Sequence, residues 1–198
     1  MDKLVKPDYN ISPATFQPII INERKRNKII HAKWGFIPFW AKDPKNGLKL
    51  ANARSETIDI KASFKKAFKA QRCLVPASGF YEWEKTEEGS IPYAVTLKNQ
   101  DFVSFAGIYE YWSNPRGGLI PTYTILTVAP NEKIKRIHDR MPVILSKNTE
   151  SYWLNNSTTL KQLKELLTPY KQEETDIHRV SMAVNKPSSS GEHLIEPI

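Results

Sequence analysis

The sequence has a single cysteine and no long apolar run, and each of these absences excludes a class of protein. Cys73 is alone, so no disulfide can form within the chain, which fits a reducing compartment. No stretch approaches the roughly 18 consecutive apolar residues that a membrane-spanning helix needs. Residues 1–7 contain charged side chains but not the apolar segment of a signal peptide. We therefore expect a cytoplasmic protein with no membrane partner.

Motifs for metal, phosphate and serine chemistry are also missing. No glycine-rich loop follows an expected strand in the pattern that surrounds a nucleotide phosphate. The four histidines and Cys73 lack the spacing of a metal site. Ser78 and Gly79 lack the flanking glycines of a nucleophile elbow. The sequence predicts no metal and no cofactor, and it argues against nucleotide hydrolysis and the common serine hydrolases.

Positive charge, in contrast, is abundant. The chain has 29 lysines and arginines against 21 aspartates and glutamates, which gives a net charge of +8 and a pI of about 9.4. A basic surface attracts polyanions, and nucleic acid is the commonest polyanion inside cells. Many basic proteins bind no nucleic acid, so charge alone leaves the two interpretations evenly balanced.

Short apolar segments separated by turn residues dominate the chain. Its 198 residues, 40% hydrophobic and 25% charged, suit one globular domain spanning 1–198. Strands are predicted at 16–21, 28–34, 93–97, 102–108, 122–128, 143–145 and 180–184. Helices are predicted at 61–71, 131–138 and 158–167. We expect an α+β fold that is mostly β, a barrel or curved antiparallel sheet with a few peripheral helices.

Two segments contain candidate binding residues. In the Asn-Ala-Arg-Ser-Glu-Thr segment at 52–57, the Asn52 amide can both donate and accept hydrogen bonds, and Arg54 can bind a phosphate. A capped turn before a helix explains the same residues without a site. Residues 34–42 interleave aromatic rings with glycine, proline and lysine, as a platform for unpaired bases does. Trp34 and other early aromatics suit the core, whereas Trp40 is expected to be exposed.

Two titratable residues are candidates for proton transfer. In a strand, Glu82 lies between aromatic neighbours, and partial desolvation would raise the pKa of its carboxyl and suit it to acid–base chemistry. The alternative is an exposed glutamate at a strand edge. His138 is the last residue of the predicted helix at 131–138, and the C-terminus of a helix favours a protonated imidazole. It is therefore either a catalytic group or a helix cap.

Five short motifs occur in order along the chain. They are Tyr-Asn-Ile-Ser-Pro at 9–13, Trp-Gly-Phe-Ile-Pro at 34–38, Asn-Ala-Arg-Ser-Glu-Thr at 52–57, Phe-Tyr-Glu-Trp at 80–83 and Ile-His-Asp-Arg-Met-Pro at 137–142. Together they resemble the SRAP family, the SOS-response-associated peptidases. Val-Asn at 184–185 and Leu-Ile-Glu-Pro at 194–197 fit the C-terminal end of that family. The resemblance therefore covers nearly the whole chain.

The resemblance implies a β-rich fold with a basic groove for single-stranded DNA and a role in the DNA damage (SOS) response. Family members capture abasic sites with a cysteine that becomes N-terminal after removal of the initiator methionine. Its amine condenses with the sugar aldehyde and its thiol closes a stable thiazolidine ring, whereas an amine alone gives a hydrolysable imine. The resemblance also implies autopeptidase activity. We expect a monomer without cofactors, which associates with the nucleoid when bound to DNA.

The resemblance also assigns roles to residues that carry the motifs. Asn52 would position the terminal cysteine, Glu82 would handle protons near the sugar, and His138 would assist ring opening and proton transfer. Arg54 and Arg140 would hold phosphates. The DNA path would be lined by Asn10, Pro13, Trp40 and Thr127.

The opening of the chain departs from the family pattern. That pattern begins Met-Cys-Gly-Arg, whereas this chain begins Met-Asp-Lys-Leu, so the opening strand and its catalytic cysteine are missing from the expected place. Cys73 lies in an apolar strand and carries no α-amine, so it is no substitute. Either the sequence is a shortened form of a complete protein, or it is a paralogue that keeps only DNA binding. The intact motifs favour the first, and on either account we expect no thiazolidine from the chain as written.

Three functions are therefore compared. The leading one is an abasic-site DNA–protein cross-linking enzyme with autopeptidase activity. The second is a non-catalytic module for single-stranded DNA, and the third is a peptidase acting on other proteins, for which the sequence offers no usable nucleophile. Whether the chain as written is an enzyme stays open.

Overall fold

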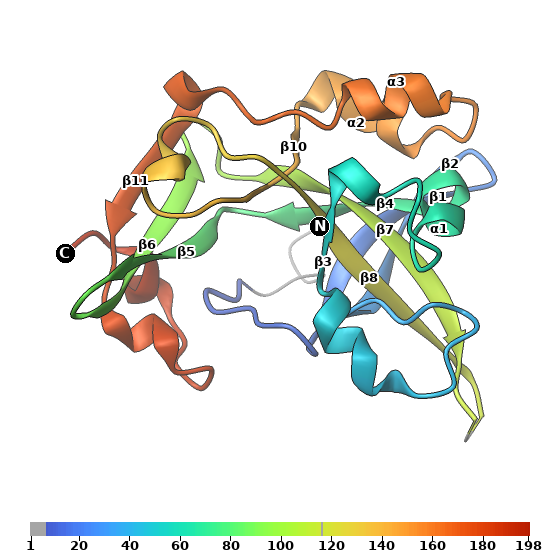
Figure 1. The fold of residues 1–198 in the computed structure, drawn as a ribbon, viewed down its shortest axis with the longest axis horizontal. Helices are drawn as coiled ribbons and strands as arrows, with labels where there is room; N and C mark the ends of the chain where they lie inside the picture. The colour runs from blue at the N-terminus through green and yellow to red at the C-terminus, as the bar shows by residue number, and fades with distance from the viewer. Residues whose placement is uncertain (1–6, 116) are drawn as a thin grey trace.

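Strands make up most of the regular structure in the computed structural model, which describes residues 7–115 and 117–198 (Figure 1). The strands are β1 (Phe16–Glu23), β2 (Arg26–Trp34), β3 (Asn52–Arg54), β4 (Arg72–Ala77), β5 (Phe80–Thr86), β6 (Gly89–Leu97), β7 (Val103–Ser113), β8 (Leu119–Val128), β9 (Met141–Pro142), β10 (Ile144–Leu145) and β11 (Thr175–Arg179). The helices are α1 (Lys65–Ala70), α2 (Lys147–Leu154) and α3 (Leu160–Glu165), and short 3₁₀ turns include η1 (Pro44–Leu50), η2 (Ser55–Thr57), η3 (Ile134–Arg136) and η5 (Met182–Asn185). The expected α+β, mostly β fold class is confirmed. Among these helices none is long and apolar enough to cross a membrane.

Five strands close into a barrel. β1 pairs antiparallel with β2 and with β4, β4 pairs with β7, and β7 pairs with β8. The ring closes because β8 also runs parallel to β2. β3 pairs parallel with β8, β9 pairs antiparallel with β8, and β10 pairs with β7. The predicted barrel is confirmed, with parallel pairings at the two places where β8 meets β2 and β3.

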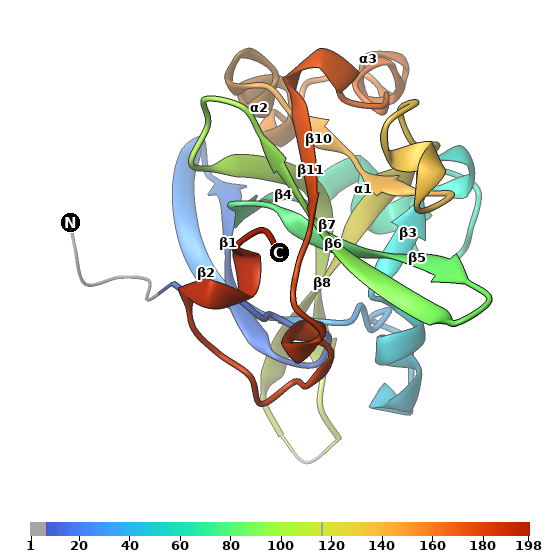
Figure 2. The ribbon, with the colours of Figure 1, turned by 90° about the vertical axis from the view of Figure 1, so that its left-hand side faces the viewer.

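A second, three-stranded sheet of β5, β6 and β11 lies beside the barrel. Figure 1 shows it at the left of the molecule, and Figure 2 shows it in front of the barrel. β6 serves both units because alternate side chains of a strand point to opposite faces. Val95 and Leu97 belong to the core of the barrel. A separate small core consists of Ala94, Val180 and Val184, with Tyr81 and Trp83 packed against it.

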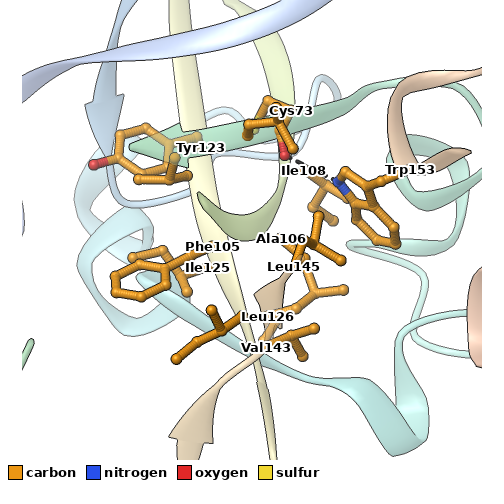
Figure 3. Close-up of a cluster of buried hydrophobic side chains, with 14 of the residues drawn as sticks. Cys73, Phe105, Ala106, Ile108, Tyr123, Ile125, Leu126, Val143, Leu145 and Trp153 are labelled. Carbon is orange, nitrogen blue, oxygen red and sulfur yellow. Dashed lines mark hydrogen bonds between the residues drawn. The ribbon is translucent and has the colours of Figure 1, made fainter. Parts of the chain in front are cut away.

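The main core contains buried side chains from all five barrel strands together with Phe68 of α1, Trp153 of α2 and Leu163 of α3. Figure 3 shows part of it. β7 is buried along nearly its whole length, as its almost continuous apolar sequence predicts. The Trp153 indole of α2 packs on this core and donates a hydrogen bond of 2.9 Å to the Cys73 carbonyl oxygen. The Cys73 thiol is fully buried, and burial raises its pKa. The expectation that Cys73 is a buried core residue is confirmed.

Arg72 is a buried cation that joins the ends of two helices. Its side chain is almost inaccessible, and burial lowers the pKa of its guanidinium. Its donors bond to carbonyl groups at the C-terminal ends of α1 and α2, where helical carbonyl oxygens lack partners. The acceptors are Phe68 O at 3.0 Å, Lys69 O at 2.5 Å, Trp153 O at 2.6 Å and Asn155 O at 2.8 Å. Arg72 therefore fixes both helices to the first residue of β4.

Two predicted elements are wrong and one helix was not predicted. The helix expected at 131–138 is only the turn η3, although the Asn131 side chain caps its start, as expected, by accepting from the Ile134 N–H at 3.1 Å. The strand expected at 180–184 is instead the turn η5, started by the Ser181 hydroxyl, with β11 just before it. α2 escaped prediction because its sequence is mostly polar and only its last two residues are buried.

Candidate functional site

Glu82 and His138 face each other between the small sheet and the loop that follows η3. The Glu82 Oε1 atom lies 3.2 Å from His138 Nδ1, and the two side chains are 18% and 37% exposed. Glu82 lies on β5 of the small sheet, and the chain passes from β4 of the barrel into β5 through Gly79. A Cβ atom at Gly79 would lie 2.5 Å from the Val95 carbonyl oxygen, so only glycine lets β5 approach β6 this closely. The structure thus brings the two predicted proton-transfer residues together.

The Glu82 carboxyl titrates near neutral pH. Burial raises its pKa to about 7, although the charge of His138 and the N–H of Trp83 act in the opposite direction. The nearby charge of Asp139 adds a smaller increase. A group with a pKa close to the surrounding pH can both accept and release a proton during a reaction. The alternative of an exposed glutamate at a strand edge does not describe this side chain.

Three groups surround the Nδ1 atom of His138. Nδ1 lies 3.2 Å from Glu82 Oε1 and 3.0 Å from the Arg140 carbonyl oxygen, both of which are acceptors. The Arg140 backbone nitrogen lies 3.2 Å from the same atom. Nδ1 thus faces two acceptors and one backbone N–H donor, and it donates or accepts according to the tautomer of the ring. The Oδ1 atom of Asp139 lies 3.7 Å from Nε2.

Arg140 forms an ion pair with Glu56 through both arms of its guanidinium. Nη1 lies 2.7 Å from Glu56 Oε1, and Nη2 lies 2.9 Å from Oε2. Nη2 also donates to the Thr127 carbonyl oxygen at 2.6 Å. The hydrogen bond from Arg140 holds the pKa of the Glu56 carboxyl below its usual value. Arg140 and Thr127, both expected to contact DNA, are therefore bonded to each other within the protein.

Asn52 and Arg54 lie on β3, which pairs parallel with β8. Arg54 is opposite Thr127 in the register. Asn52 and Arg54 are exposed, whereas Ala53 between them is buried, as the alternation of a strand requires. The residues that follow form the turn η2. The expected turn is present in the second half of segment 52–57, without a side-chain cap, whereas binding by Asn52 and Arg54 stays a prediction.

The aromatic segment divides between core and surface. Phe36 is fully buried, and the half-buried Trp34 donates to the Ala51 carbonyl oxygen at 2.9 Å. Trp40 is 56% exposed, as expected, and Phe39 is 50% exposed with the Lys66 ammonium 3.9 Å from its ring centre. Exposed rings beside cations are the surface on which unpaired bases stack.

Asn10 bonds to the C-terminal part of the chain. Its amide nitrogen lies within hydrogen-bond distance of three carbonyl oxygens, those of Val184 at 3.2 Å, Lys186 at 2.9 Å and Ser189 at 3.3 Å. A groove of about 570 Å³ lies between residues 7–18 and 187–191 and includes Asn10 in its wall. Pro13 is exposed nearby in the sequence. That either residue lines a DNA path stays a prediction.

Comparison with known proteins establishes the family. The sequence pattern of the family described as "SOS response associated peptidase (SRAP)" matches residues 1–187. The chain belongs to the SRAP family.

Curated relatives of this SRAP chain share a name. The abasic site processing protein YoqW of Bacillus subtilis is 43% identical over 192 residues, which cover 96% of this chain and 86% of YoqW. The abasic site processing protein HMCES of Xenopus tropicalis is 31% identical over 212 residues, which cover 91% of this chain and 63% of HMCES. A solved structure of a protein from Bacteroides thetaiotaomicron matches with a TM-score of 0.85 and 29% identity, over 93% of this chain and 82% of that one.

Glu56 is a residue of the candidate site for which the sequence predicted no role. It lies within the 52–57 motif, but nothing local indicates its partner, because Arg140 is 84 positions away. The departure from the family's Met-Cys-Gly-Arg opening falls on residues 1–4, outside the described residues. Within the described part of the chain, the sole thiol is the buried Cys73.

The raised pKa of Glu82 makes the stability of this SRAP chain depend on pH. The folded-state pKa of about 7 exceeds the ordinary 4.5, so folding favours the protonated carboxyl. This stabilisation is fully present below about pH 4.5 and is lost as the pH rises through about 7. Relative to Glu82→Gln, the unfolding free energy should fall by about 2–3 kcal/mol across that range, measured by urea unfolding. A difference that is constant with pH would contradict the raised pKa.

Proposed function

We propose that this SRAP chain binds single-stranded DNA at abasic sites and takes part in processing them. The Glu82–His138 pair is the observation that carries this proposal, because it combines a carboxyl of pKa about 7 with an imidazole 3.2 Å away. The exposed Arg54, the exposed Trp40 and the net charge of +8 support a nucleic-acid substrate. Relatives named abasic site processing proteins support the choice of an abasic site.

The chemistry of an abasic sugar suits this pair. The sugar exists mainly as a closed hemiacetal, and only its open form has a reactive aldehyde. Opening removes a proton from the anomeric hydroxyl and adds one to the ring oxygen, which requires a base and an acid together. Glu82 acts as the group that exchanges protons at the sugar, and His138 assists from 3.2 Å away. Asn52 and Arg54, on the exposed face of β3, position the reacting group and a flanking phosphate.

Covalent capture as a thiazolidine, with autopeptidase activity, is the finer part of the proposal and belongs to forms with an N-terminal cysteine. Cys73 does not supply the thiol, because it is fully buried and has no α-amine. This burial also favours a second candidate function for the chain as written, a module that binds single-stranded DNA without reacting. Such a module would show salt-sensitive binding with no preference for abasic DNA.

A denaturing gel with abasic single-stranded DNA tests the proposal. The chain as written is compared with a version that carries the family's opening Met-Cys-Gly-Arg strand, and binding of intact and abasic DNA is measured in parallel. We expect tighter binding of abasic DNA by both and a slow-migrating covalent band from the cysteine-bearing version alone. Equal binding of the two DNAs and no band from either version would replace the proposal with the binding module.

Trp40 and Arg54 should contribute to DNA binding in different ways. Trp40→Ala is expected to weaken binding of single-stranded DNA by about 5- to 100-fold, because a base–aromatic stack contributes about 1–3 kcal/mol. Arg54→Ala should lower the slope of log affinity against log salt by about 0.7, the value for one phosphate contact on a single strand. Fluorescence anisotropy at several salt concentrations measures both. Phe102→Ala, which removes another exposed ring, is the matched control, and an equal loss there would contradict a specific stack at Trp40.

A further inference from the structure

Glu56 connects the two halves of the candidate site. It lies in η2, two positions after Arg54 at the end of β3, while its carboxylate binds Arg140 in the loop that carries His138. We propose that Glu56 is a positioning residue, which acts through Arg140 to hold His138 against Glu82 for the reaction put forward under the proposed function, on which this inference rests. Glu56 itself contacts neither member of the pair.

The first link is the fork between Glu56 and Arg140. Its two hydrogen bonds of 2.7 and 2.9 Å fix the position and the plane of the guanidinium, as a single-point contact would not. The Thr127 carbonyl oxygen accepts a third bond at 2.6 Å, which attaches the same group to β8. The Arg140 side chain is only 17% exposed. Glu56 is 53% exposed, so the three-point geometry, and not burial, is what makes this attachment hold the loop better than a single-point surface ion pair does.

The second link runs through the backbone of Arg140. Its carbonyl oxygen lies 3.0 Å from His138 Nδ1 and its nitrogen lies 3.2 Å from the same atom. The position of Arg140 therefore sets the orientation of the imidazole that meets Glu82 at 3.2 Å. Without the carboxylate of Glu56, the guanidinium keeps only its bonds to Thr127, and the 138–140 loop loses its attachment to η2.

A competing role for Glu56 would be to occupy Arg140 until a DNA phosphate displaces it. The two roles predict opposite effects of removing the carboxylate. A competitor leaves the Glu82–His138 pair unchanged and, once removed, strengthens DNA binding. A positioning residue, once removed, disturbs the pair and slows the reaction without strengthening binding.

Carbon-13 NMR of the Glu82 carboxyl provides a test that needs no DNA. In the unaltered chain its titration midpoint is expected near pH 7. In Glu56→Ala the midpoint should rise by about one pH unit, because an opposite charge within about 4–6 Å lowers a carboxyl pKa by 1–3 units and His138 is then held less closely. The opposing effect of Asp139 is the smaller one. Glu56→Gln keeps one oxygen for Arg140 and should give a smaller rise.

Glu23→Gln is the matched control for this measurement. Glu23 is 56% exposed against 53% for Glu56, and it also pairs with a cation, Lys28. Its replacement removes the same charge and should leave the Glu82 midpoint unchanged. An unchanged midpoint in Glu56→Ala, or in Glu56→Gln if the alanine variant does not fold, overturns the positioning role.

The reaction with abasic single-stranded DNA gives the second readout, in the cysteine-bearing version of the chain. Glu56→Ala should slow covalent capture by about tenfold or more while binding of intact DNA stays the same. Tighter binding of intact DNA with an unchanged midpoint would identify Glu56 as a phosphate competitor and overturn the proposal. If the unaltered chain shows no preference for abasic DNA while the midpoint still moves, the proposed function fails and the action of Glu56 on the pair is supported.

Discussion

Replacing Glu82 with glutamine is expected to slow the reaction with abasic DNA by about 10²- to 10⁴-fold, the usual contribution of a positioned acid–base group. Glutamine has nearly the shape of glutamate and can keep a hydrogen bond to His138, but it cannot exchange a proton with the sugar. Binding of abasic DNA should therefore change little. The measurement is a single-turnover time course on denaturing gels with the cysteine-bearing version of the chain.

The control for Glu82→Gln is Glu84→Gln. Glu84 lies two positions further along β5, on the same face of the strand, and accepts a hydrogen bond from the Tyr93 hydroxyl at 2.9 Å. An equal loss of rate in the two variants would show that charge near β5 matters and that proton transfer by Glu82 does not. His138→Ala should lose a similar factor. The double variant should lose little more, because residues that act as one unit are not additive.

Arg72→Met should produce the largest loss of stability of any single substitution considered for this protein. It leaves the carbonyl oxygens at the ends of α1 and α2 without their donors, and a buried polar group without a partner costs about 1–3 kcal/mol. We expect the unfolding free energy to fall by about 3–5 kcal/mol and the melting temperature by about 10 °C. Urea and thermal unfolding followed by circular dichroism measure both.

Arg72→Lys separates geometry from charge. Lysine keeps the positive charge but has a single ammonium, which cannot reach two helix ends with a planar fork. Arg72→Lys should therefore lower the unfolding free energy nearly as much as Arg72→Met does. Lys69→Ala, at an exposed position of α1, should change the unfolding free energy by less than about 0.5 kcal/mol. Full stability in Arg72→Lys would mean that the buried charge matters and the hydrogen-bond network does not.

The parts of this fold that could be predicted are those in which burial leaves a local pattern. β7 and β8 are nearly continuous apolar runs because they are buried on both faces, so both strands were predicted. Their bounds were less well predicted, since β7 continues to Ser113 and not only to 108, and β8 begins at Leu119 and not at 122. The 131–138 segment has the N-terminal cap of a helix, but Ile134 is its only fully buried member, so little tertiary packing supports a longer helix there. The strand predicted at 180–184 was wrong because its signal was the apolar Val180 and Val184. Both are buried in the small core, but a turn can bury them as well as a strand can.

The candidate site divides in the same way. Glu82 and His138 could be selected as candidates from the sequence, since a carboxyl between aromatic residues and a histidine among charged residues are unusual locally. Their 3.2 Å contact could not be predicted from local pattern, because it depends on how the small sheet lies against the barrel. The partner of Arg140 is set by the parallel pairing of β3 with β8, which no local sequence feature specifies.

The parallel pairing of β2 with β8 also has a consequence for how the protein folds. Lys33 meets Thr122 and Trp34 meets Tyr123 in this pairing, so the ring closes between segments far apart along the chain. The β1–β2 and β7–β8 hairpins are local contacts and can form early, whereas distant contacts require long loops to close first and make folding slow. The pairing of β3 with β8 is equally distant, since Asn52 meets Ile125, whereas β9 meets β8 between residues close in sequence, such as Val128 and Met141. We therefore expect a newly made chain to form its core hairpins and place the His138 loop before it places Asn52 and Arg54.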